Sequence, residues 1–355
     1  MIPYLIPIFL CIWGLFNYDL NERKDSRADI LWYFLFVYLT LLIGLRNHIG
    51  GDSLVYEEFF NDYYDVTHWR FNLLDFYQPG FTLLVSISKY IYPQFASFQL
   101  IHAFIVNTLL FIFISNNSKY RFIVLLIILY MLYLYYMTEI LREIIAIMIF
   151  SISYPFYKNK KWIKYYIGVA LACMFHFSAI ILTIIPLLRN IRLNYFYILL
   201  IIATVFLAIF TKKLLGFMVE GAIADKAIGN SHSFVGYSMT IACVLKGVVF
   251  PLIFSLFVKF GTKFTIKYEN MIAILILIGF ASVFFPLLYG RTLNYFYLFL
   301  CLSFGDYCAN AIKSSNHISK INFVFIITLF LLCYLSSYLV LGGWYRYWIP
   351  YKSLI

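Results

Sequence analysis

The sequence predicts an all-α membrane protein, a polytopic bundle of about twelve transmembrane helices. Of its 355 residues, 63% are hydrophobic and only 12% are charged, about half the charged fraction of a soluble domain. Long apolar runs, such as 122–137 and 195–210, approach the roughly 20 residues needed to cross a hydrocarbon core. Lipid offers no hydrogen-bond partner to a backbone, so these runs are expected to be helical. Their density predicts a single integral membrane domain over residues 1–355.

Each expected helix is an apolar run bounded by polar or turn residues. We place membrane helices near 2–18, 30–46, 79–93, 98–115, 121–137, 140–157, 163–187, 195–210, 238–258, 269–289, 292–309 and 321–341. The 163–187 segment differs from the others, because both of its flanks are basic and His176 lies at its middle. A broken or re-entrant helix is expected there, a form tolerated at membrane depth only where it lines a polar cavity.

Two connections, near 47–77 and 211–237, are too long to be simple turns. The first is acidic, with Arg70 as its one basic residue. Most Lys and Arg residues lie instead in short connections, as the positive-inside rule expects of cytoplasmic loops. The 47–77 loop is therefore predicted to be a larger outer loop. The same rule explains most of the net charge of +11, so nucleic acid is discarded as a partner.

Several polar residues lie at predicted helix ends or within predicted spans, where they are costly and tend to mark function. The charged or titratable residues among them that could bind or react with a substrate are Arg46, Asp52, Glu139, Arg142, Glu143, His176 and Arg291. Each has a plainer interpretation: an arginine that extends to the headgroups, an intrahelical ion pair, a hydrogen-bonded core histidine, or an Asp that caps a helix after a Gly-Gly turn. Taken together, three arginines at non-cytoplasmic helix ends suit a dianionic group, because guanidinium binds phosphate oxygens in pairs.

Four segments carry a family resemblance. The run Gly44–Tyr56 resembles the Arg…Gly-x-Asp…Tyr signature of the EpsG-like branch of Wzy-type polysaccharide polymerases. Glu139–Ala146 is similar to that family's Arg-Gln-x-x-Ala helix start, Phe175–Ala179 to its Phe-His-x-Ser-Ala element, and Gly290–Phe296 to its late Arg…Tyr-Phe element. The segments fall in the family's order. Glu143 replaces the common Gln, and Gln78 stands where an acid is frequent.

The resemblance implies a glycosyltransferase of the bacterial inner (cytoplasmic) membrane, and it leaves a GT-C-like helix arrangement open. Such an enzyme joins undecaprenyl-diphosphate-linked oligosaccharide repeat units into O-antigen or capsular polysaccharide at the periplasmic face. Its partners are the lipid-linked donor and acceptor, membrane lipid and a chain-length regulator protein. An O-antigen ligase with the same donor, and a flippase or transporter of lipid-linked oligosaccharide, are the alternatives.

The residues receive the following expected roles. Arg46, Arg142 and Arg291 bind the diphosphate, whose negative charge they stabilise as it leaves. Asp52 is the first candidate for the base and His176 the second, with Tyr56, Glu139 and Glu143 in support. No DxD, HExxH or phosphate-binding loop is present, so neither a cofactor nor a metal ion is expected.

Overall fold

The computed structural model describes residues 2–21, 26–72, 77–191, 241–261, 264–282, 286–314 and 347–354, with short pieces between 317 and 330. These residues are helical or irregular, and they contain no strand beyond an isolated bridge between Arg46 and Ser353. Within the described part of the chain, five helices are long and apolar enough to cross a membrane: Ile2–Asp19, Ser26–Gly44, Phe95–Asn117, Arg121–Thr138 and Ile241–Lys259. The predicted all-α, multi-pass class is confirmed.

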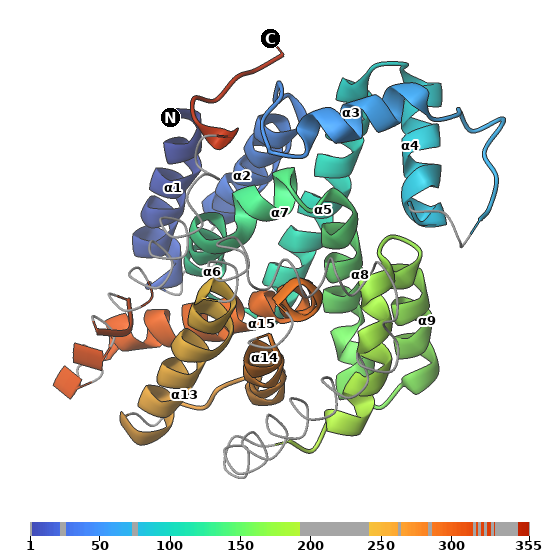
Figure 1. Cartoon of the computed structure of the whole chain (residues 1–355). Helices are drawn as coiled ribbons and strands as arrows, with labels where there is room; N and C mark the ends of the chain where they lie inside the picture. The colour runs from blue at the N-terminus through green and yellow to red at the C-terminus, as the bar shows by residue number, and fades with distance from the viewer. Residues whose placement is uncertain are drawn as a thin grey trace. The chain divides into compact units, whose positions relative to one another are not determined.

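The chain divides into two compact units, Met1–Thr183 with Trp344–Ile355, and Ile184–Gly343. The helices of the first unit, shown in Figure 1, are α1 (Ile2–Gly14) with the π-helix Leu15–Asp19, α2 (Ser26–Gly44), α3 (Ser53–Asp62), α4 (Pro79–Ile91), α5 (Phe95–Asn117), α6 (Arg121–Ile128), the π-helix Leu129–Tyr133, α7 (Leu134–Thr138), α8 (Leu141–Lys158) and α9 (Trp162–Cys173). Phe177–Leu188 follows as a 3₁₀ helix, η3.

The core of the first unit is a row of packed helices. Helix α2 packs on α5, α5 on α8, and α8 on α9. The last pair is close, because a Cβ at Gly168 would overlap the side chain of Ser153. Small residues let membrane helices approach in this way. The outward faces of α1 and α2 expose large apolar side chains such as Phe9, Trp13 and Phe34, which suits contact with lipid.

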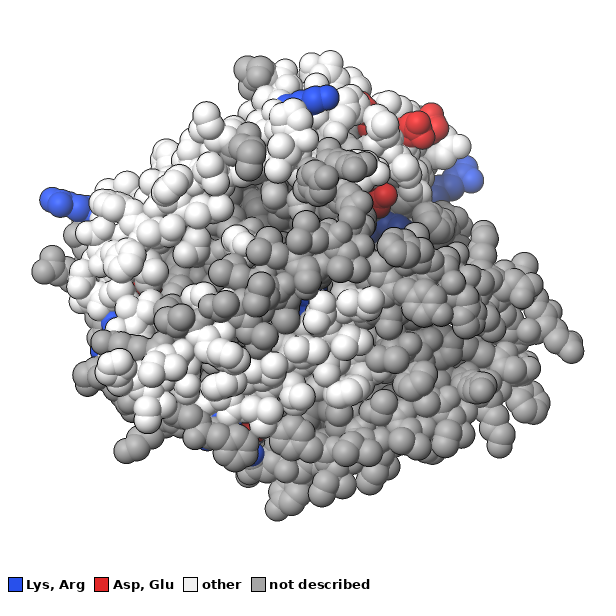
Figure 2. Space-filling model, turned by 60° about the vertical axis from the view of Figure 1, so that its left-hand side comes forward, with Lys and Arg blue, Asp and Glu red and all other residues white. Residues whose placement is uncertain are grey.

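Charged side chains are sparse on the surface as well. On the face shown in Figure 2, most described atoms belong to uncharged residues, and few Lys, Arg, Asp or Glu side chains interrupt them. A soluble protein would present far more charge over the same area. The surface therefore agrees with the helix lengths in indicating a membrane protein.

Helix α3 lies within the predicted outer loop, and its own sequence fixes how it packs. Ser53, Tyr56 and Phe60 are spaced at three and four residues and form its buried face. Its last carbonyls have no partner within the helix. Lys89 of α4 satisfies two of them, since its Nζ donates to the carbonyl oxygens of Phe60 and Asn61 at 3.1 and 2.7 Å, and it also donates to the carbonyl oxygen of Tyr63, which follows the helix, at 2.6 Å.

The 163–187 segment is broken, as expected. Helix α9 ends at Cys173 and η3 begins at Phe177. The two pieces run back along each other, because the hydroxyl of Tyr165 donates to the carbonyl oxygen of Leu182 at 2.7 Å. His176 lies in the turn between them. The turn is fixed to the start of α4 by a 2.8 Å hydrogen bond from the Gly80 N–H to the Met174 carbonyl.

The C-terminal segment, residues 347–354, returns to the end of α2. The Asn47 N–H donates to the Lys352 carbonyl at 3.0 Å, and the Leu354 N–H donates to the Leu45 carbonyl at 2.9 Å. The Tyr4 hydroxyl of α1 donates to the carbonyl of Trp348 at 2.9 Å. The two ends of the chain are thereby held on the same part of the first unit (Figure 1).

The second unit contains the π-helix Leu245–Val249, α13 (Phe250–Gly261), α14 (Glu269–Ala281) and α15 (Pro286–Lys313). The expected boundary between 289 and 292 is wrong, because α15 runs through it. Helix α14 ends earlier, and α15 begins at Pro286, a residue suited to a first helical turn, where its missing N–H costs nothing. The predicted helix at 195–210, most of the one at 321–341 and the connection at 211–237 lie outside the described residues.

Candidate functional site

Arg46 follows the end of α2 and is almost wholly buried, with 1% of its surface exposed. Its Nη1 donates to the Ile43 carbonyl at 2.7 Å, while its buried Nε has no hydrogen-bond partner. Burial lowers the pKa of Arg46 to about 10, and the nearby Glu139 carboxylate opposes that shift. The guanidinium is therefore charged near pH 7. It is buried within the protein and does not extend toward the surface.

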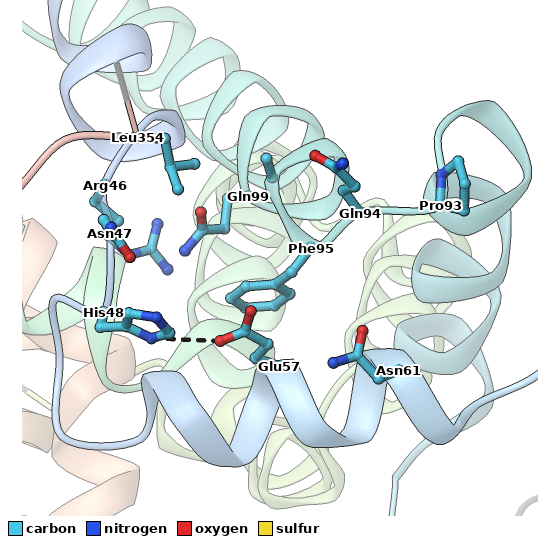
Figure 3. Close-up of a pocket in the computed structure, with 11 residues that line it drawn as sticks. Arg46, Asn47, His48, Glu57, Asn61, Pro93, Gln94, Phe95, Gln99 and Leu354 are labelled. Atoms are coloured by element: carbon cyan, nitrogen blue, oxygen red, sulfur yellow. Dashed lines mark ion pairs between the residues drawn. The ribbon is translucent and has the colours of Figure 1, made fainter.

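A cavity of about 240 Å³ opens beside this guanidinium (Figure 3). Its inner wall includes Arg46 and Gln99 of α5, which are 1% and 2% exposed. Its outer part holds an ion pair between His48 Nδ1 and Glu57 Oε2 at 3.3 Å, with side chains 50% and 32% exposed. The remaining lining residues are Asn47, Asn61, Pro93, Gln94, Phe95, Ala96 and Leu354. All of them belong to the first unit.

The Gly50-Gly51 turn carries Asp52 to the start of α3. Gly50 has a positive φ of 110°, and its N–H donates to the Tyr347 carbonyl at 3.2 Å. The Gly51 N–H donates to both carboxylate oxygens of Glu139, at 3.1 and 2.8 Å. Asp52 occupies the N-cap position, but its side chain makes no capping hydrogen bond and is exposed. Its carboxylate is thus available to a ligand.

Glu139 joins three segments that are distant in the sequence. Besides the Gly51 N–H, its Oε1 accepts hydrogen bonds from Trp348 Nε1 at 2.9 Å and from Thr138 Oγ1 at 3.1 Å. The side chain is 3% exposed. Burial raises the pKa of this carboxyl, and the hydrogen bonds from Trp348, Gly51 and Thr138 oppose the rise. Glu139 therefore fixes the turn that presents Asp52.

Arg142, at the start of α8, lies over the ring of Tyr77, with its Cζ 4.6 Å from the ring centroid. It also hydrogen-bonds the side chain of Tyr56, whose pKa is raised by burial to about 12 and lowered in part by Arg142. Asp52 is near enough to act on the pKa of both Tyr56 and Glu139. We call Asp52, Tyr56, Tyr77 and Arg142 the Arg142 cluster. It places a half-buried cation and a carboxylate together.

The comparison with protein families decides the assignment of the chain. A model of the EpsG family matches residues 29–353, and this range contains both the Arg142 cluster and the Arg46 cavity. The chain belongs to the EpsG family. Membership suggests a polysaccharide-polymerase type of role. Among curated proteins and among solved structures, none matches the chain.

The other expected site residues of this EpsG family member are placed as follows. His176 is buried, and its Nδ1 lies 2.6 Å from the Ser178 hydroxyl oxygen. Its turn meets the start of α4, which follows Tyr77. Glu143 is buried in the first turn of α8. Arg291 is an exposed residue of α15 in the second unit, where Thr292 and Leu293 beside it are buried.

Sequence reasoning missed several residues that line or support the site. Gln99 and His102 are buried polar residues at a spacing of three in the apolar helix α5, and that spacing was the available signal. His48 and Glu57 are separated in the sequence, and nothing local indicates that they pair. Trp348 lies near the C-terminus, far from every motif. Among the described residues, no group of three or more His, Cys, Asp or Glu side chains is placed to hold a metal ion.

Proposed function

We propose that this EpsG family protein polymerises undecaprenyl-diphosphate-linked oligosaccharide repeat units into O-antigen or capsular polysaccharide, on the periplasmic side of the inner membrane. One observation carries the proposal. The two arginine-bearing segments of the first unit, residues 46–52 and the start of α8, meet through the Gly51–Glu139 hydrogen bonds. A carboxylate and a guanidinium thereby share one cluster, and these are the base and the anion-stabilising group of an inverting glycosyl transfer from a diphosphate.

In the proposed reaction, the bond between the donor sugar's anomeric carbon and the diphosphate oxygen breaks. The electron pair leaves with the lipid diphosphate, whose charge Arg142 stabilises. A hydroxyl oxygen of the acceptor repeat unit forms the new bond to that carbon, and Asp52 takes the hydroxyl proton. His176 is the second candidate for this proton. Arg46 and Arg291 are the further guanidinium groups proposed to bind the anionic substrate.

The neighbours of Arg142 support its role. The face of Tyr77 holds the cation through a cation–π interaction, worth about 0.5–2 kcal/mol, and Tyr56 fixes its orientation. A guanidinium held on two sides is preorganised, so little of its rotamer entropy remains to be lost when it binds a diphosphate.

The test uses the full chain reconstituted in nanodiscs with lipid-linked repeat units, analysed by gel for a ladder of chain lengths. Arg142→Gln and Asp52→Asn are expected to leave only single units, while Arg70→Gln, an exposed arginine of the same outer loop, keeps the ladder. Transfer to a lipid A–core acceptor without any ladder identifies a ligase. Movement of intact lipid-linked units across the bilayer without bond formation identifies a flippase. Either result overturns the proposal.

A further inference from the structure

The Arg46 cavity contains a buried cation that makes no ion pair with any described residue, although the Glu139 carboxylate acts on it from a greater distance. Among the described residues, no carboxylate lies within 4 Å of the Arg46 guanidinium, and its buried Nε has no partner. A buried charge is costly unless it is paired and hydrogen-bonded. The guanidinium points into the cavity (Figure 3). An oxyanion bound there would supply the missing partner.

The acid nearest the cavity is already engaged. Glu57 lines the same cavity, but its carboxylate pairs with His48 at 3.3 Å. His48 adopts a positive φ of 47°, a conformation that is uncommon for a residue with a side chain and that persists only where surrounding contacts hold it. Glu57 therefore pairs with His48 and makes no ion pair with Arg46, and the His48–Glu57 pair places polar groups at the more exposed end of the cavity.

The rest of the lining suits a sugar ring better than a bare inorganic anion. Gln99 offers a buried amide beside Arg46, and Asn61 offers a second amide from α3. Phe95 supplies an apolar ring between these polar groups (Figure 3). A pyranose carries hydroxyls along its edges and C–H groups on its faces, so amides and an apolar surface complement the two parts of the ring.

We propose that the Arg46 cavity binds a sugar residue that carries an oxyanion, either a carboxylate or a phosphate substituent, in the repeat unit being polymerised. This inference rests on the proposed function and assigns a substrate class to it. The oxyanion binds Arg46 and Gln99 at the buried end, the ring packs on Phe95, and hydroxyls meet Asn61 and Glu57. Arg142 does not line the cavity, so the two arginines serve different anions.

The experiment measures binding to the full chain in nanodiscs by saturation-transfer NMR and calorimetry. The three probes are glucuronate, glucose and inorganic pyrophosphate. Glucuronate has the ring and the charge, glucose has the ring alone, and pyrophosphate has the charge alone. We expect glucuronate to bind at least about ten-fold more tightly than glucose, because a hydrogen bond to a charged group contributes about that factor in affinity. We also expect glucuronate to bind more tightly than pyrophosphate.

Variants then place the binding in the cavity. Arg46→Gln and Gln99→Ala are each expected to weaken glucuronate binding about ten-fold. Gln99→Ala keeps the test decisive if Arg46→Gln fails to fold. Asn117→Ala, at the opposite end of α5, is the matched control and should bind normally. Arg142→Gln should also keep glucuronate binding, while it abolishes the polymer ladder.

Three results overturn the inference. Pyrophosphate that binds as tightly as glucuronate and is lost in Arg46→Gln would make the cavity a diphosphate site. Equal affinity for glucose and glucuronate would remove the role of the charge. Absence of binding by all three probes would leave the cavity without a sugar ligand. In each case the ladder assay still reports on polymerisation, so failure here is distinct from failure of the proposed function.

Discussion

Trp348 Nε1 donates a 2.9 Å hydrogen bond to Glu139 Oε1, across 209 positions of the sequence. The same carboxylate accepts the Gly51 N–H, so the C-terminal segment, the turn before α3 and the start of α8 share one acceptor. Asp52 follows that turn directly. The position of the proposed base therefore depends on residues that take no part in the reaction.

Glu139→Gln should destabilise the protein and impair polymerisation. A carboxylate accepts from Gly51, Trp348 and Thr138 at once, whereas an amide offers one acceptor oxygen and sets its NH₂ group against a donor. Losing a buried acceptor of this kind costs about 1–3 kcal/mol in the free energy of unfolding. Thermal unfolding in detergent measures the loss. Glu58→Gln, an exposed residue on α3, is the matched control, and equal melting temperatures for the two variants would contradict this role of Glu139.

Trp348→Phe should change how stability depends on pH. Burial raises the pKa of Glu139 above its ordinary value of 4.5. A carboxyl with a raised folded-state pKa contributes stability that is fully present below its unfolded pKa and is lost as pH rises through the folded pKa. Removing the indole donor raises that pKa further, so the loss should extend to higher pH.

The measurement is the melting temperature against pH for the wild type and Trp348→Phe. Trp13→Phe, an exposed tryptophan on α1, serves as the control and should follow the wild-type curve. Superimposable curves for all three proteins would show that the indole N–H does not tune Glu139.

Tyr77→Leu should lower polymerisation several-fold, because it removes the aromatic face under Arg142. The cation–π interaction is worth about 0.5–2 kcal/mol, and each 1.4 kcal/mol is roughly a factor of ten. Tyr77→Phe keeps the ring and should retain most of the activity. The initial rate of ladder formation measures both variants, and a loss that is equal in the two would assign the effect to the hydroxyl instead.

Gly50→Ala should be strongly destabilising, and Gly51→Ala should be tolerated. Gly50 has φ 110°, and a Cβ there would lie 2.8 Å from the Thr138 carbonyl oxygen. Such a conformation costs a non-glycine residue about 1–3 kcal/mol, before the clash is counted. Gly51 is exposed and has no positive φ. Thermal unfolding of the two purified variants measures the difference in stability, and similar melting temperatures would refute this prediction for Gly50.

Much of the fold followed from local patterns, and the errors have local causes. The run lengths predicted helices α2, α5 and α8 to within a few residues at most ends. The basic flanks of residues 163–187 predicted the break at His176, because two basic flanks are expected on the same side of the membrane and the segment must then turn back within it. The predicted boundary at Arg291 was wrong because a polar side chain does not by itself end a helix, and α15 continues through that residue from Pro286 to Lys313.

By itself the sequence determined that the chain is a helical membrane protein of the EpsG type, and it supplied the polar residues that are proposed to carry its chemistry. These properties depend on hydropathy and motif order within short stretches. Only the tertiary structure decided that Glu139 accepts hydrogen bonds from Gly51 and Trp348 and that Asp52 does not cap α3. It also decided that Arg46 lines a cavity together with His48 and Glu57. Those contacts join segments far apart in the chain, and the packing of whole helices sets which of them meet.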